Sequence, residues 1–182
     1  MDDSEVIPGM VKGKEARMEN DDREYVPHST GCFLCGEDNQ AGLQTRFFVV
    51  ENEVRGAVAI PRRMNSYKDV VHGGILAALL DETMGWSATV FGKARLMFVT
   101  AELTVRYMRP VPVEKEITVR SRLVRDVGRL AYCEGELLLD SEVCARGKGT
   151  FSPLGREGTA KVLPYLRFHD CKKLKNLFEG CR

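Results

Sequence analysis

The residue types that could do chemistry gather in one predicted helix. Residues 72–91 are expected to form it, because the run from Ile75 to Leu80 puts apolar side chains on nearly all of its faces. Such a helix is wrapped by its sheet rather than lying on a surface. Asp81 and Glu82 interrupt the apolar surface in the middle of the helix. Because a buried carboxylate without a partner is costly, two acids here indicate a function or a specific partner.

The start of the same helix is unusual for a different reason. His72 is followed by Gly73 and Gly74, two residues of low helix propensity. A helix N-terminus offers N–H donors and a partial positive charge, which suit a developing oxyanion. Glycine lets a bulky group approach the backbone closely, and a carboxylate such as Asp81 can attack a carbonyl or activate water. Together these features suit chemistry at a carbonyl group.

The elements around this helix alternate with a period of two residues, which indicates strands. A hairpin is predicted around Glu51 and Asn52, and four strands are predicted after the helix. The expected strand ranges are 43–50, 53–60, 98–109, 116–125, 129–139 and 142–151. Two strands, one long helix and four strands predict an α+β fold with one helix against one antiparallel sheet.

Several strings in this part of the chain resemble one family. VVHGGILAALLDETMGWSA is preceded by MNSY and followed by TAELTVRYMRPVP, and CFLCGEDNQAGL stands before the first strand. They resemble the hotdog-fold acyl-CoA thioesterases of the phenylacetate-pathway (PaaI-like) type over residues 30–152. The resemblance implies a long central helix wrapped by a curved antiparallel sheet. It also implies dimers in which two helices lie side by side, with a dimer of dimers (a homotetramer) as a further possibility.

The resemblance also implies roles for individual residues. Gly73 matches the glycine whose N–H polarises the thioester carbonyl, and Asp81 matches the acid that is general base or nucleophile. Thr100 stands where relatives place a hydroxyl that positions water or the acid. Asn65 lies near an Asn or Gln that orients the carbonyl or the water, although its spacing from His72 is seven residues and some relatives have six.

Helix geometry limits any site that uses both the glycines at the helix start and Asp81. Gly74 and Asp81 are seven residues apart, so they share a helix face but lie about 10 Å apart along the axis. Gly73 is farther still. One helix therefore cannot bring its own Asp81 to a carbonyl at its own N-terminus. Two antiparallel helices across a two-fold axis can, so the hypothesis requires a dimer.

Each of these residues also has a structural interpretation. Asp81 and Glu82 could each be satisfied by an ion pair or hydrogen bond within a dimer, and Glu82 faces about 100° away from Asp81. His72 lies nine residues from Asp81 on the opposite helix face. We therefore interpret it as an orienting residue of the site rather than as the base. Glu82 and Gly74 are placed among the substrate-binding residues.

Basic side chains are expected either on a solvated surface or against the phosphates of coenzyme A. Arg106 and Arg109 are the candidates for this contact, and Arg62 and Arg63 are basic residues of the same kind. Acyl-chain specificity would depend on the depth of an apolar pocket. Trp86, Phe91, Met97 and Phe98 are candidates for its lining.

Cys32 and Cys35 form a CxxC motif, which invites a zinc or redox interpretation. Structural zinc usually needs a second ligand pair, and the other four cysteines form no CxxC. A turn before the first strand is therefore the preferred interpretation, and zinc completed by His28 is the alternative. We predict no metal and no bound cofactor, since coenzyme A would be part of the substrate.

Charge and length indicate how the chain is divided into a domain and two terminal segments. The chain has 182 residues, 27 basic and 26 acidic, which argues against a general electrostatic grip on nucleic acid. Residues 1–24 carry a net charge of −4 and are expected to be a mobile acidic tail, and residues 25–154 form the predicted domain. Residues 155–182 carry a net charge of +4. The near-helical spacing of Leu166, Cys171, Leu174, Leu177 and Phe178 predicts a helical extension that packs on the domain, with a membrane-surface or partner helix as the alternative.

The sequence thus favours an acyl-CoA thioesterase that acts at least as a homodimer. A non-catalytic acyl-CoA binding or sensing protein of the same fold is the alternative. Dehydration or hydration of an acyl thioester is less favoured, because His72 is not placed for it. The start of the chain has no apolar segment like that of a signal peptide, and the six cysteines are interpreted as reduced thiols, so we expect a soluble cytoplasmic protein.

Overall fold

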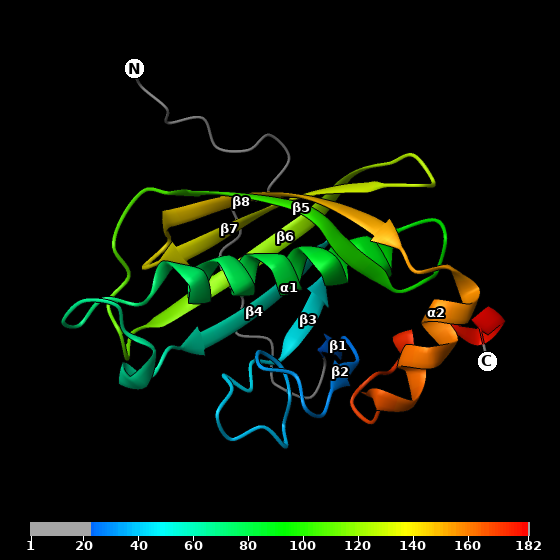
Figure 1. Ribbon diagram of the computed structural model, residues 1–182, viewed down its shortest axis with the longest axis horizontal. Helices are drawn as coiled ribbons and strands as arrows, with labels where there is room; N and C mark the ends of the chain where they lie inside the picture. Colours follow the sequence, from blue (N-terminus) through cyan, green and yellow to red (C-terminus); the bar gives the residue numbers. More distant parts are fainter. Residues whose placement is uncertain (1–22, 182) are drawn as a thin grey trace.

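One long helix lies across a single antiparallel sheet in the computed structural model, which describes residues 23–181 (Figure 1). The sheet has seven strands in the order β1-β3-β4-β6-β7-β8-β5. Its strands are β1 (Glu24–Tyr25), β3 (Phe47–Val50), β4 (Glu53–Ala59), β5 (Phe98–Tyr107), β6 (Glu116–Asp126), β7 (Ala131–Leu139) and β8 (Glu142–Pro153). The long helix is α1 (Gly73–Phe91). The predicted order of strands and helix is therefore confirmed, with strand ends shifted by a few residues.

The remaining elements are short. A 3-10 helix, η1 (Arg62–Met64), precedes α1. The C-terminal extension begins with α2 (Gly155–Val162) and continues through η2 (Leu163–Tyr165), β9 (Leu166–Arg167), η3 (Leu174–Asn176) and η4 (Glu179–Cys181). β9 pairs with β2 (His28–Ser29) to form a second, two-stranded sheet.

Local turn chemistry closes the hairpins that the sequence predicts. The turn between β7 and β8 has Asp140 and Ser141 in succession at positive φ, 51° and 68°. Two such residues give the turn a twist that matches the right-handed twist of the flanking strands. The turn between β3 and β4 has Glu51 at φ 53°.

Two glycines lie on the face of the sheet that packs against α1, so no side chains project toward the helix from these two positions. Gly135 of β7 and Gly147 of β8 are register partners. A Cβ on Gly135 would meet Leu80 at 3.2 Å, and one on Gly147 would meet Met84 at 3.0 Å. Leu80 and Met84 are fully buried. The paired glycines therefore let the helix approach the sheet closely, which explains how this apolar face is buried.

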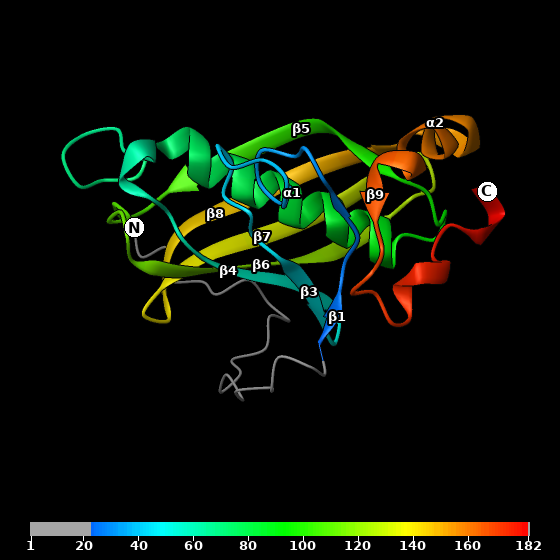
Figure 2. The ribbon, with the colours of Figure 1, turned by 90° about the horizontal axis from the view of Figure 1, so that it is seen from below.

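The opposite face of α1 is covered by the segment between β2 and β3. Seen from below, this segment crosses the helix, so α1 lies between it and the sheet (Figure 2). The thiol of Cys35 in this segment donates a hydrogen bond to Glu82 of α1 at 3.4 Å. The entry segment, which we define as residues 30–46, is therefore a second cover for the helix.

The two ends of the predicted domain differ from expectation. Glu24, assigned to the acidic tail, is part of β1, and its carboxylate accepts N–H groups of Lys172, Lys173 and Leu174 at 2.8–3.1 Å. Residues 1–22, the rest of that tail, lie outside the described residues. The helix expected from the apolar spacing over 166–178 is wrong, because β9 and 3-10 turns occupy this stretch. Pairing with β2 and the contacts to Glu24 satisfy its backbone instead.

Apolar side chains of the extension pack on the domain. Leu166, Leu177 and Phe178 are buried members of the main hydrophobic core. In the described part of the chain, no helix is both long and apolar enough to cross a membrane.

Candidate active site

The N-terminus of α1 is held in place by two side chains. His72 is the N-cap, and its Nδ1 accepts the N–H of Gly74 at 2.9 Å. The hydroxyl of Tyr107 donates to the carbonyl of Gly73 at 2.8 Å. Among the described residues no hydrogen bond engages the Gly73 N–H. The first turn therefore keeps this donor available. As the N-cap, His72 orients the start of the helix, which is compatible with the orienting role expected from the sequence.

Asp81 in the middle of α1 has one hydroxyl partner. Thr100 of β5 donates to Oδ1 of Asp81 at 2.7 Å. Asp81 is half-buried and Thr100 is exposed, so the carboxylate lies at the edge of the molecule rather than in its core. A charge-assisted bond of this length fixes the orientation of the carboxylate and leaves its other oxygen for chemistry.

An irregularity in β5 brings both hydroxyls to the helix. Thr100 and Tyr107 are seven residues apart, and in a regular strand an odd separation places side chains on opposite faces. The register shifts between Thr100 and Glu102, so Ala101 is an extra residue in the strand. This bulge restores both hydroxyls to the same face. Sequence reasoning missed Tyr107, because the odd spacing from Thr100 predicts opposite faces and the bulge that reverses this is not visible in the sequence.

The chain does not bring Gly73 and Asp81 together by itself. They are eight residues apart on one continuous helix, which corresponds to about 12 Å along its axis. The single protomer therefore holds two half-sites, an N–H donor at the helix start and a carboxylate farther along.

The other predicted site residues lie apart from this pair. Asn65 is exposed, and its backbone forms a bridge with Val71 just before α1. Among the described residues, no hydrogen bond joins the Asn65 side chain to Gly73 or Asp81. Arg106 is exposed on β5, and Arg109 forms an ion pair with Glu142. Arg109 therefore already has an acidic partner at the surface.

Glu82 turns toward the entry segment instead of toward Thr100. Its Oε1 accepts the Trp86 indole N–H at 3.0 Å as well as the Cys35 thiol. Burial raises the pKa of Glu82 to about 7, and the neighbouring Cys32 adds to the effect. Glu82 therefore has the partners that its structural interpretation requires, and it is not grouped with Asp81 at one reacting centre.

The CxxC motif forms the turn that was expected, and it also reaches the helix. The Sγ of Cys32 accepts the N–H groups of Leu34 and Cys35 at 3.3 and 3.5 Å. The hydrogen bond from the Cys35 thiol lowers the pKa of Cys32 to about 6 and raises the pKa of Cys35. The two sulfurs and a Glu82 oxygen lie within 4.8 Å of one another. No spacing in the sequence predicts this grouping.

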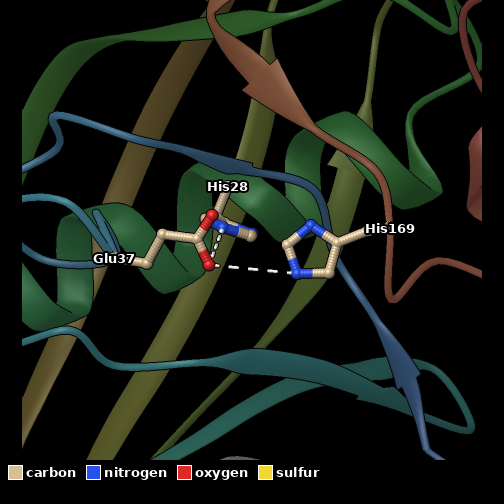
Figure 3. Close-up of side chains that lie close together, drawn as sticks. All are labelled: His28, Glu37 and His169. Carbon is tan, nitrogen blue, oxygen red and sulfur yellow. Dashed lines mark ion pairs between the residues drawn. The ribbon is translucent and has the colours of Figure 1, made fainter.

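His28 does not belong to the cysteine group. It lies instead beside Glu37 and His169, as Figure 3 shows (Figure 3). The alternative in which His28 completes a zinc site with Cys32 and Cys35 is therefore not supported by the arrangement of these side chains.

A cavity of about 480 Å³ lies away from these groups. It is in the C-terminal extension, lined by Ala160, Leu163, Pro164, Leu166, Phe168 and Cys181. No residue of the candidate site lines it. Trp86 and Phe98, which sequence reasoning placed in an acyl pocket, are buried in the core.

A helix laid across one antiparallel sheet, with a glycine pair at its start and an acid in its middle, defines a hotdog fold. Residues 68–145 match the model of the thioesterase superfamily. Residues 68–145, which hold α1 and the strands β5, β6 and β7, are therefore similar to the thioesterase superfamily.

Three known proteins are similar to this chain, with different sequence identities and coverages. A crystal structure of a thioesterase superfamily protein is 29% identical, with a TM-score of 0.62, over 67% of this chain and 60% of that one. This chain thus spans less than two thirds of that relative. The PaaI protein of the E. coli phenylacetic acid degradation operon is 18% identical over 64% of this chain and 83% of its own, with a TM-score of 0.57, which shows a shared fold. An uncharacterised protein of Schizosaccharomyces pombe is 26% identical over 134 residues, which are 64% of this chain and 76% of that protein.

Proposed function

We propose that this protein is an acyl-CoA thioesterase, which hydrolyses an acyl thioester to a carboxylic acid and coenzyme A. The match of residues 68–145 to the thioesterase superfamily supports thioester hydrolysis in general. The observation that carries the proposal is the pair of half-sites on α1. The Gly73 N–H has no partner among the described residues, and Asp81 is oriented by Thr100 beside the edge strand β5.

The proposed site forms between two protomers. The thioester carbonyl of one substrate would accept the Gly73 N–H of one chain, where the positive end of the helix stabilises the oxyanion. Asp81 of the partner would act as general base on water or as the nucleophile. Thr100 would hold the carboxylate, and Tyr107 would hold the Gly73 peptide. The free edge of β5 leaves room for a second chain, and its exposed Val99 suits an interface.

Thiol release from short, medium and aromatic acyl-CoAs tests the activity. Asp81→Asn should lower kcat by about a thousandfold while leaving unfolding unchanged, because it removes a charge from a half-buried carboxylate without changing its size. Asp140→Asn is the matched control. Asp140 is an exposed acid in a turn at positive φ, a conformation that Asn tolerates. Equal activity of Asp81→Asn and the control would contradict the mechanism.

Mixing two inactive chains tests the shared site. Gly73→Ala should hinder the approach of the thioester to the N–H, and its Cβ lies 3.4 Å from the Tyr107 ring, an ordinary contact, so the chain should fold. When Gly73→Ala and Asp81→Asn chains are co-expressed, a mixed dimer has one intact site and one doubly damaged site. Random pairing should restore about a quarter of the wild-type activity. If both groups act within one protomer, co-expression restores nothing.

The alternative function is a non-catalytic acyl-CoA binding protein of the same fold. Arg109, one of the two candidates for the coenzyme A phosphates, is paired with Glu142, so this contact does not favour binding over turnover. Tight binding of acyl-CoA by the wild type, with no thiol release from any member of the panel, would establish the alternative.

A further inference from the structure

A second group of chemically capable side chains lies where the chain's two ends meet. His28 comes from β2, Glu37 from the entry segment, and His169 follows β9 by two residues (Figure 3). β2 and β9 are paired, with His28 opposite Arg167, so the ladder brings the two histidines to the same place. Their rings lie 5.3 Å apart at 86°. None of these three residues belongs to the proposed thioesterase site.

The separations of the three side chains match those of ligands around one small ion. Nε2 of His28 lies 3.3 Å from Oε2 of Glu37, and Nε2 of His169 lies 3.9 Å from the same oxygen. All three groups have ligand atoms within 4.8 Å of one another. For a tetrahedral zinc with bonds of about 2.1 Å, neighbouring ligand atoms lie about 3.4 Å apart. Small side-chain movements would therefore complete this geometry.

His28 provides an independent reason to expect a ligand. Its side chain is only 2% exposed, Nδ1 has no hydrogen-bond partner among the described residues, and Nε2 has the Glu37 carboxylate at 3.3 Å without a hydrogen bond of good geometry. A buried polar group without a partner is costly and needs an explanation. Burial, aided by the charge of Arg46, lowers the pKa of His28.

The surroundings suit a cation despite the nearby arginine. Arg46 is paired with Asp170 at 2.8 Å, which balances its charge. The same Asp170 oxygen lies 3.2 Å from Nε2 of His169, which places a second carboxylate beside this proposed ligand atom and adds negative charge to the site. Glu37 and His169 are 40% and 50% exposed, which leaves a route for the ion and room for water as a further ligand.

We propose that His28, Glu37 and His169 bind one divalent transition-metal ion, most suitably zinc, and that this ion fastens the C-terminal extension to the entry segment. Two imidazoles and one carboxylate are ligands that zinc favours. The CxxC turn fixes the Glu37 side of the site, because the N–H of Gly36 bonds to the Cys32 carbonyl at 3.0 Å. The ion would join segments that are more than a hundred residues apart in sequence.

Cobalt(II) is the probe that separates this site from the cysteine group. The full chain, stripped with a chelator, is titrated with Co²⁺ and then with Zn²⁺ in competition with a chromophoric chelator. One equivalent should bind with visible d–d bands and without a thiolate-to-cobalt charge-transfer band. A strong charge-transfer band would place the ion at Cys32 and Cys35 and overturn the proposal.

Variants give the quantitative test. His169→Ala and Glu37→Gln change exposed side chains and should each weaken Zn²⁺ binding by about a hundredfold. Cys32→Ser should leave the affinity unchanged. In the wild type, Zn²⁺ should slow amide hydrogen exchange in β2 and β9, and His169→Ala should abolish this protection. Equal affinity of His169→Ala and wild type, or no stoichiometric binding to the wild type, would refute the site.

Discussion

The buried carboxyl of Glu82 should make the stability of this protein depend on pH. Burial raises its pKa from an ordinary value of 4.5 to about 7. The folded state therefore holds this proton more tightly than the unfolded state does. The corresponding stability is fully present below pH 4.5 and is lost as the pH rises through about 7. At about 1.4 kcal/mol per pH unit, the difference amounts to about 3 kcal/mol.

Glu82→Gln removes the titration and keeps an oxygen for the Cys35 thiol and the Trp86 N–H. The free energy of unfolding would be measured with guanidinium chloride at about pH 5 and about pH 8. Relative to wild type, the Glu82→Gln variant should gain about 2.5 kcal/mol between the two conditions, since part of the full difference is already lost at the lower pH. If the difference between the two proteins is the same at both pH values, the reasoning is wrong.

The thiol of Cys32 supplies the control for this experiment. Because the Cys35 hydrogen bond lowers the pKa of Cys32 to about 6, its ionisation stabilises the folded state as the pH rises, opposite to Glu82. The wild type and the Glu82→Gln variant should therefore be compared again with Cys32→Ser added to both. Burial is the largest cause of the raised Glu82 pKa, so the difference should shrink without the thiol and should not vanish.

Three further changes test other parts of the structure. Thr100→Val removes the hydroxyl that orients the proposed catalytic carboxylate, and steady-state assays should show kcat lower by about tenfold with KM little changed. Glu136→Ala leaves Arg120 and Arg146 without their fully buried shared carboxylate, and denaturant unfolding should show a loss of about 3 kcal/mol. Glu24→Ala removes the acceptor for three consecutive backbone N–H groups, so hydrogen exchange at residues 172–174 should quicken by about tenfold with little change in the rest of the domain.

The fold was accessible from the sequence because its signals are local. The period-two strands and the apolar helix each depend on neighbouring residues, and the helix was placed within one residue of its observed start at Gly73. The hairpin at Glu51 followed from the same alternation. The extension was harder, because the spacing from Leu166 to Phe178 fits a helix equally well. Its actual conformation depends on pairing with β2, which local periodicity does not encode.

The candidate site was accessible only in part. The glycines at the helix start and Asp81 stand on one element, so a single string reveals them. The roles of Thr100 and Tyr107 depend on a bulge that reverses the facing of side chains in β5. The grouping of Cys35 with Glu82 joins residues 47 positions apart through the path of the entry segment. Contacts of this kind arise from three-dimensional packing and leave no spacing to read.

The entry segment contacts both groups of chemically capable side chains, the one on α1 and the one beside the C-terminal extension. Its Cys35 holds the helix residue next to Asp81, and its Glu37 lies beside the histidine of the C-terminal extension. Only one residue separates these two side chains, so one short, hydrogen-bonded turn contacts both the C-terminal extension and the middle of α1. The extension and the half-site at Asp81 are therefore joined by contacts at neighbouring residues of the entry segment.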